Sequence, residues 1–215
     1  MYYDKYLYIC DIIKILNMKI IGKNSLAKYL SYLFLILFIF IAFHVIYEFI
    51  GYAITYINLK TNNSFLSETF YVGHSIDWAE KIITNPDHLF FRFKYPFSDQ
   101  QMLTGNYTLG TFFNHAIAGI FWSIFLFYGY KISKALSKED IFSKEIIRFL
   151  KTLYISIFVF VSLYIINWVI ISKIPFSGSL FFSSFAYIFI AIIAAFTAEF
   201  FKKGYKLQSE NDLTI

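Results

Sequence analysis

The feature that most constrains the fold is a run of 25 uncharged residues, Ile174–Ala198, near the end of the chain. A helix of this length rises roughly 37 Å, which is enough to cross a hydrocarbon core of about 30 Å with some tilt. Lys173 precedes the run and Glu199 ends it, followed by a basic pair and a polar segment. We therefore predict a membrane-spanning helix over residues 178–201.

Three further apolar segments have span length, and they predict helices over about 30–52, 112–130 and 152–172. Composition agrees, because only 15% of the residues are charged, whereas a soluble domain has about 25%. The predicted fold class is an all-α integral membrane four-helix bundle. We expect a membrane domain over residues 30–204, between a cytoplasmic N-terminal segment at 1–29 and a cytoplasmic tail at 205–215.

The distribution of basic residues predicts the orientation of the spans. Of the 19 Lys and Arg residues, 14 lie in the N-terminal segment, in the connector 131–151 and in residues 202–215. Loops rich in Lys and Arg face the cytoplasm, so we expect both termini inside a bacterial cytoplasmic (inner) membrane. The long segment between the first two spans would then be extracytoplasmic. The positive net charge is explained by this asymmetry, and we expect no direct binding of nucleic acid.

The first 17 residues allow two interpretations. Asp4, Asp11 and Lys14 fall at helical spacing, with apolar residues available for another face, which favours a short helix on the inner membrane surface. Alternatively, translation begins at Met18, and the preceding residues are an upstream extension. After this segment, Ser25 is placed to cap the first spanning helix.

The segment 60–111 is the one long stretch outside the predicted spans. Ser75 followed by acidic residues, with Pro86 eleven residues later, predicts a helix over 75–83. The run LFFRFKYPF at 89–97 alternates aromatic and basic residues, as a strand or an interfacial segment does. A loop of this length either has a functional role or folds into a small packed cap, and the sequence leaves both alternatives open.

The connector and the tail are the predicted surfaces for a protein partner. Ser143 is placed to cap the third spanning helix, and Glu145 falls in its first turn. Gly204 falls where a helix C-cap is expected. The short ending either docks a partner or packs against the connector, and both alternatives remain. The candidate partner-binding residues are Ser143, Glu145, Gly204, Leu207, Glu210, Asp212 and Leu213.

The same two regions carry a family resemblance. The ending AEFFKKGYKLQSENDLTI (198–215) has an apolar helix, an acid-Phe pair, the basic pair Lys202-Lys203, Gly204, Leu207 and then Glu210–Ile215. It resembles the closing signature of domain-of-unknown-function family 2975, uncharacterised bacterial membrane proteins. The connector around Phe142-Ser143 and the segment MKIIGKNSLAKYL are also similar to that family. The resemblance extends from about Met18 to the end, and it implies a compact four-helix membrane protein without a known reaction. It also implies a possible helix-turn-helix regulator as partner.

Several polar residues are candidates for chemistry at the outer ends of the spans. His44, Glu48 and His115 would form a metal site or a proton relay if they converge, and otherwise serve as structural polar contacts. His74 with Asp77, and Asp87 with His88, have spacing that fits a surface metal site but also ordinary solvated loop residues. Asn114 and Asn167 are expected to cross-link helices.

No metalloprotease, nucleophile-elbow, phosphate-loop or dinucleotide fingerprint occurs in the sequence. We therefore expect a non-enzymatic protein with no cofactor, no metal and no catalytic residue, which acts through partners as a regulatory, sensor-like or immunity-type component. The alternative is a small transporter or channel component that uses the outer polar residues. A membrane-embedded metalloenzyme is the third hypothesis.

Overall fold

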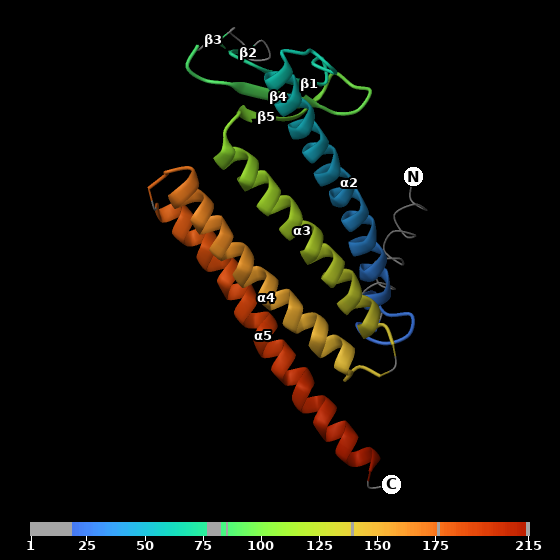
Figure 1. Ribbon diagram of the computed structural model, residues 1–215. Helices are drawn as coiled ribbons and strands as arrows, with labels where there is room; N and C mark the ends of the chain where they lie inside the picture. The colour runs from blue at the N-terminus through green and yellow to red at the C-terminus, as the bar shows by residue number, and fades with distance from the viewer. Residues whose placement is uncertain (1–18, 77–82, 85, 139, 176, 214–215) are drawn as a thin grey trace, which may run out of the picture. The chain divides into compact units, whose positions relative to one another are not determined.

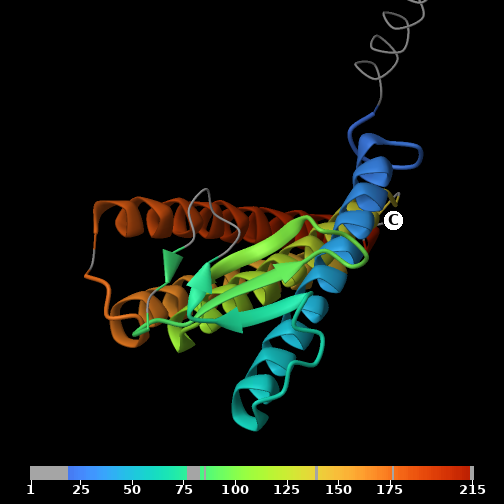
Figure 2. The same ribbon diagram turned by 90° about the horizontal axis from the view of Figure 1, so that it is seen from above.

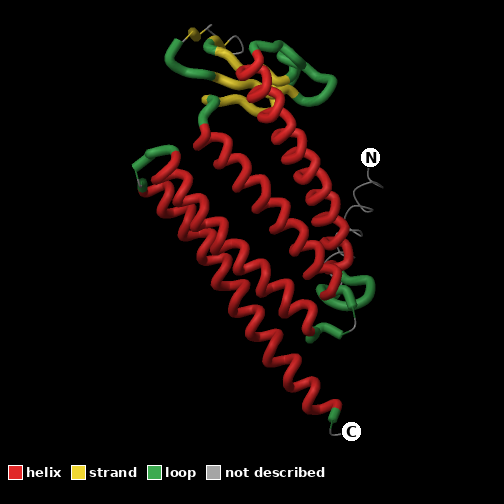
Figure 3. Tube along the Cα trace, in the orientation of Figure 1, coloured by secondary structure: helices red, strands yellow, loops and turns green. Residues whose placement is uncertain are grey.

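The computed structural model of the protein describes residues 19–76, 83–84, 86–138, 140–175 and 177–213. Figure 1 labels the elements of this part of the chain, and Figure 3 distinguishes helices from strands by colour. The helix predicted for residues 1–17 lies outside the described residues. The helical elements are α2 (Leu26–Thr61), α3 (Leu109–Leu136), α4 (Lys144–Ile166), the π-helical turn η1 (Asn167–Ile171) and α5 (Gly178–Asp212).

Four of these elements are long and apolar enough to cross a membrane, counting α4 and η1 together. They cover the four predicted spans, except that the third segment ends at Ile171, one residue before its predicted end. The first helix continues to Thr61, through the further apolar stretch Gly51–Leu59. Many large apolar side chains on these helices are exposed, including Phe43, Phe182 and Phe196. Exposed apolar surface of this extent is what lipid would cover in a spanning helix.

The chain divides into two compact units, and each long helix contributes a part to both. The first unit comprises residues 1–38, 124–157 and 189–215. Its core cluster is formed by Ala135, Ile146, Leu150 and Ala198. The second unit comprises residues 39–123 and 158–188, and it contains all the strands described.

A three-stranded antiparallel sheet lies within the second unit, in the order β1 (Phe70–Gly73), β4 (Phe90–Lys94) and β5 (Gln101–Asn106). The arrows of these strands run side by side in Figure 2. Of the two alternatives for LFFRFKYPF, the strand is the one found, as β4 in the centre of the sheet. Its period of two places Phe91 and Phe93 in the core, while the alternating basic residues stay partly exposed.

An aromatic cluster joins the sheet to α2. Tyr52, Phe70, Phe91 and Phe93 are buried together, and the ring centroids of Tyr52 and Phe93 lie 5.1 Å apart. Gly51 permits this approach, because a Cβ there would lie 2.8 to 2.9 Å from ring atoms of Phe70 and Phe93. The cluster therefore fixes the sheet on one face of the helix.

The strands correct two predictions for the segment 60–111. The chain is mostly helical, but the predicted all-α class is incomplete. The structure also contains this sheet and the two-stranded pair β2 (Ser75–Ile76) and β3 (Ile83–Thr84). The helix predicted over 75–83 is wrong at both ends, where β2 and β3 pair antiparallel. Its middle, residues 77–82, lies outside the described residues. Strand pairing prevails here over the local helix-start pattern.

Two capping predictions have opposite outcomes. Ser143 accepts a hydrogen bond from the Ile146 amide (3.4 Å) and caps α4 as expected. Ser25 precedes α2, but its buried hydroxyl has no hydrogen-bond partner among the described residues. The Lys28 amide instead bonds to the Ser25 carbonyl. The start of α2 is therefore held by backbone contacts rather than by the serine hydroxyl.

Candidate functional site

The polar residues predicted at the ends of the first two spans meet in the second unit. His44, Glu48 and Tyr52 follow one another at intervals of four residues on α2, which places them along one helical face. Glu48 and Tyr52 are both buried, at 7% and 6% exposure. A buried carboxylate in an apolar helix is costly and marks a candidate functional position.

Helix α3 brings the imidazole of His115 close to these residues of α2. His115 Nδ1 lies 3.3 Å from Glu48 Oε1, although the contact does not have hydrogen-bond geometry. One turn further along α3, a Cβ at Gly119 would lie 2.7 Å from a methyl carbon of Val45. The glycine therefore allows the two helices to approach closely, as small residues do in membrane bundles. The predicted convergence of Glu48 and His115 agrees with this geometry.

Aromatic rings of the sheet close this polar pair from one side. Phe91 lies 6.5 Å from the His115 ring in an edge-to-face arrangement, and it also contacts Tyr52 at 5.3 Å. Aromatic rings therefore border the pair of Glu48 and His115 on this side. In such surroundings, transfer of a proton between carboxylate and imidazole is the simplest chemistry available to the pair.

Three buried polar atoms of this region have no hydrogen-bond partner among the described residues: Glu48 Oε1, the Tyr52 hydroxyl and Asn114 Oδ1. The same part of the chain contains no group of three or more His, Cys, Asp and Glu side chains arranged to hold a metal ion. The predicted metal set of His44, Glu48 and His115 therefore gains no support, and Glu48 with His115 remains as a pair.

The other sequence-predicted polar residues have structural contacts. Asn167 donates a hydrogen bond from Nδ2 to the Gly110 carbonyl (3.1 Å), which confirms the predicted cross-link between helices. His74 Nδ1 contacts the backbone carbonyl of His88 at 3.0 Å. Asp77, the other member of the His74 pair, lies outside the described residues.

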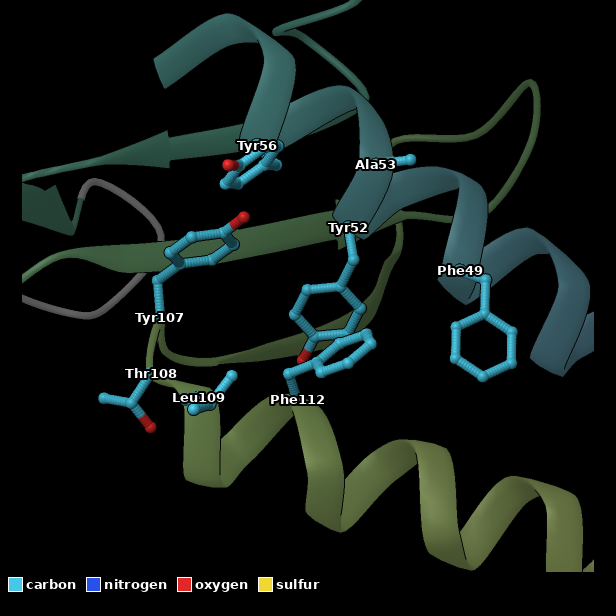
Figure 4. Close-up of a pocket in the computed structure, with 8 residues that line it drawn as sticks. All are labelled: Phe49, Tyr52, Ala53, Tyr56, Tyr107, Thr108, Leu109 and Phe112. Atoms are coloured by element: carbon cyan, nitrogen blue, oxygen red, sulfur yellow. The ribbon is translucent and has the colours of Figure 1, made fainter. Parts of the chain in front are cut away.

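A cavity of about 410 Å³ lies beside the aromatic cluster and was not predicted from the sequence. Figure 4 shows rings from α2 and from the start of α3 facing it, with Tyr107 between them. Burial raises the pKa of the Tyr107 hydroxyl, which also accepts a hydrogen bond from Thr55 Oγ1 (3.3 Å). The concentration of aromatic residues at 49–56 and 107–112 was the available signal. The lining residues are Phe49, Tyr52, Ala53, Tyr56, Tyr107, Thr108, Leu109 and Phe112.

In the first unit, the predicted partner-binding residues separate into packed and exposed groups. Ser143 caps α4, and Glu145 Oε2 pairs with Lys138 Nζ at 3.1 Å. Gly204 packs against the Phe142 ring and lies within α5, so the predicted C-cap is wrong. The exposed group consists of Glu145, Leu207, Glu210, Asp212 and Leu213, and Glu210 pairs with Lys206 at 3.7 Å.

The four apolar helices define the class of protein, because their number and length are consistent with a multi-pass membrane protein. Residues 111–215 match the family described as "Protein of unknown function (DUF2975)". The predicted resemblance is thus confirmed over α3, α4 and α5, and residues 18–110 lie outside the match. No curated protein and no solved structure matches the chain.

Proposed function

We propose that this chain is a multi-pass protein of the bacterial cytoplasmic membrane that acts without catalysis, as a regulatory, sensor-like or immunity-type component. Both termini face the cytoplasm in this proposal, in agreement with the positive charge of the N-terminal segment, the connector and the tail. The protein works by binding a partner protein at its cytoplasmic end. A helix-turn-helix regulator is the partner that the family resemblance favours.

The observation that carries the proposal is the continuation of α5 beyond its apolar part. The helix extends 13 residues past Glu199, to Asp212, rather than ending at Gly204. One side of this extension packs inward, where Phe142 lies 5.5 Å from the Phe201 ring and Lys144 lies over Tyr205. The opposite side is largely exposed, and the Phe200 ring at its edge lies 6.3 Å from the Phe142 ring.

That exposed side has the spacing of a helical recognition surface. Phe200, Lys203, Leu207 and Glu210 recur at intervals of three and four residues, and we call them the tail face. Phe200 and Leu207 are 67% and 63% exposed, one helical heptad apart. Two apolar anchors at this spacing, flanked by charges of both signs, fit the groove of a partner protein.

Photo-crosslinking from the tail face tests the proposal. A benzophenone amino acid at Leu207 is expected to give one discrete adduct with another protein in intact membranes. Lys202 is the matched control, because its side chain is 64% exposed on the same helix. It lies roughly 140° from Leu207 around the axis, at about 100° per residue. Equal adducts from both positions, or none from Leu207, would contradict a specific partner surface.

A second candidate function, a small transporter or channel component, is favoured by the buried contact between Glu48 and His115. In proteoliposomes containing a pH-sensitive dye, a proton-coupled protein would dissipate an imposed pH gradient, and Glu48→Gln would abolish this flux. The partner-binding proposal instead expects no flux above empty liposomes. It also expects Glu48→Gln with His44→Ala to retain the Leu207 adduct.

A further inference from the structure

One wall of the cavity in the second unit is formed by α2, and the residues on this wall change from apolar to charged along the helix. Phe49, Ala53, Tyr56 and Lys60 occur at intervals of four, three and four residues, which places them on one stripe of the helix. The first three line the cavity. Lys60 follows in the last turn of the helix, and its Nζ lies over the Tyr56 ring, 5.9 Å from the centroid.

The opposite wall is formed by the entry to α3. Tyr107, Leu109 and Phe112 contribute apolar surface, and Phe112 packs edge-to-face on Tyr52 at 5.0 Å. Figure 4 shows Phe112 against the Tyr52 ring, with Tyr107 on the segment that leads into α3. A volume of about 410 Å³ holds a substantial part of a hydrocarbon chain, and the residues that line it are mostly aromatic or aliphatic.

We propose that this cavity is a binding site for one anionic phospholipid, with an acyl chain between the aromatic rings and the headgroup phosphate at Lys60. The order along the stripe matches the order within a lipid, from apolar rings through a tyrosine to a cation. Tyrosine is enriched where acyl chains meet headgroups, and a lysine near a helix end reaches toward the phosphate level. The cation selects an anionic headgroup rather than a neutral one.

Native mass spectrometry tests this site on the full chain. The detergent-solubilised protein is incubated with equal amounts of phosphatidylglycerol and phosphatidylcholine, and the retained lipid is counted. The expected wild-type result is one retained phosphatidylglycerol per chain. Ala53→Trp places an indole in the cavity and should lower the retention of both lipids about tenfold, the equivalent of 1.4 kcal/mol. Lys60→Gln should remove the preference for phosphatidylglycerol while an acyl chain still binds.

Ile50→Trp is the control for the added indole, because Ile50 is 48% exposed on the same helix and does not line the cavity. It should retain lipid as the wild type does. Circular dichroism of each variant establishes that the helices are intact, and Ala53→Leu replaces Ala53→Trp if the larger side chain prevents folding. Undiminished retention in a folded cavity-filling variant would overturn the site. So would equal binding of the two lipids by the wild type, or a dimer that occupies the cavity in place of lipid.

Discussion

Replacement of Phe93 by alanine is expected to release the three-stranded sheet from α2. The Phe93 side chain is fully buried and contacts the rings of Tyr52, Phe70 and Phe91. Truncation of a buried phenylalanine costs about 3–5 kcal/mol, through lost burial and the cavity left behind. Hydrogen exchange should therefore accelerate in peptides that cover β1, β4 and β5, while α4 keeps its protection.

Phe97→Ala is the matched control, because Phe97 belongs to the same segment but is completely exposed. Its exchange pattern should equal that of the wild type. If Phe93→Ala left the sheet as protected as Phe97→Ala does, the aromatic cluster would not be what holds the sheet.

Gly204→Ala is expected to destabilise the first unit, although alanine favours helices by up to about 1 kcal/mol over glycine. The new Cβ would overlap the Phe142 ring, which is itself packed against Phe201. Overpacking of this kind typically costs about 1–3 kcal/mol, so the net effect is a loss of stability. The measurement is the midpoint of thermal unfolding in detergent, followed by the helical signal.

Gly178→Ala in the same helix supplies the control, because no atom lies within 4 Å of a Cβ built there. Its midpoint should be unchanged or slightly raised. Phe142→Ala removes the overlapping ring, so the two substitutions at positions 142 and 204 should cost less together than the sum of their separate effects. A simple sum would show that the ring is not what makes Gly204 necessary.

The helices were predictable because a long uncharged run has few alternatives to a membrane span. The strand β4 was also predictable, since Phe91 and Phe93 alternate with Arg92 and Lys94. The pair β2 and β3 was not, because the Ser75 pattern is a local helix-start signal and strand pairing is decided by residues further along the chain. Local sequence patterns therefore predicted the spans, but they did not predict the pairing of β2 with β3.

The candidate site was also only partly predictable from the sequence. Glu48 could be singled out because a carboxylate within a span is rare, and His115 because it lies near the start of the next span. Tyr52 could not, since its burial depends on strands some forty residues away. Gly204 was misread because a glycine after a basic pair fits a helix end, while its actual role is to admit the Phe142 ring.

The π-helical turn η1 has a geometric consequence for the third span. The Ser172 amide bonds to the Asn167 carbonyl, five residues back, so this turn holds one residue more than an α-helical turn. The widened turn is the last of the segment, which ends at Ile171. Asn167, the first residue of this turn, is buried, and its amide donates to the Gly110 carbonyl at the start of α3. The third span therefore closes on a polar tie to the second span rather than on apolar packing alone.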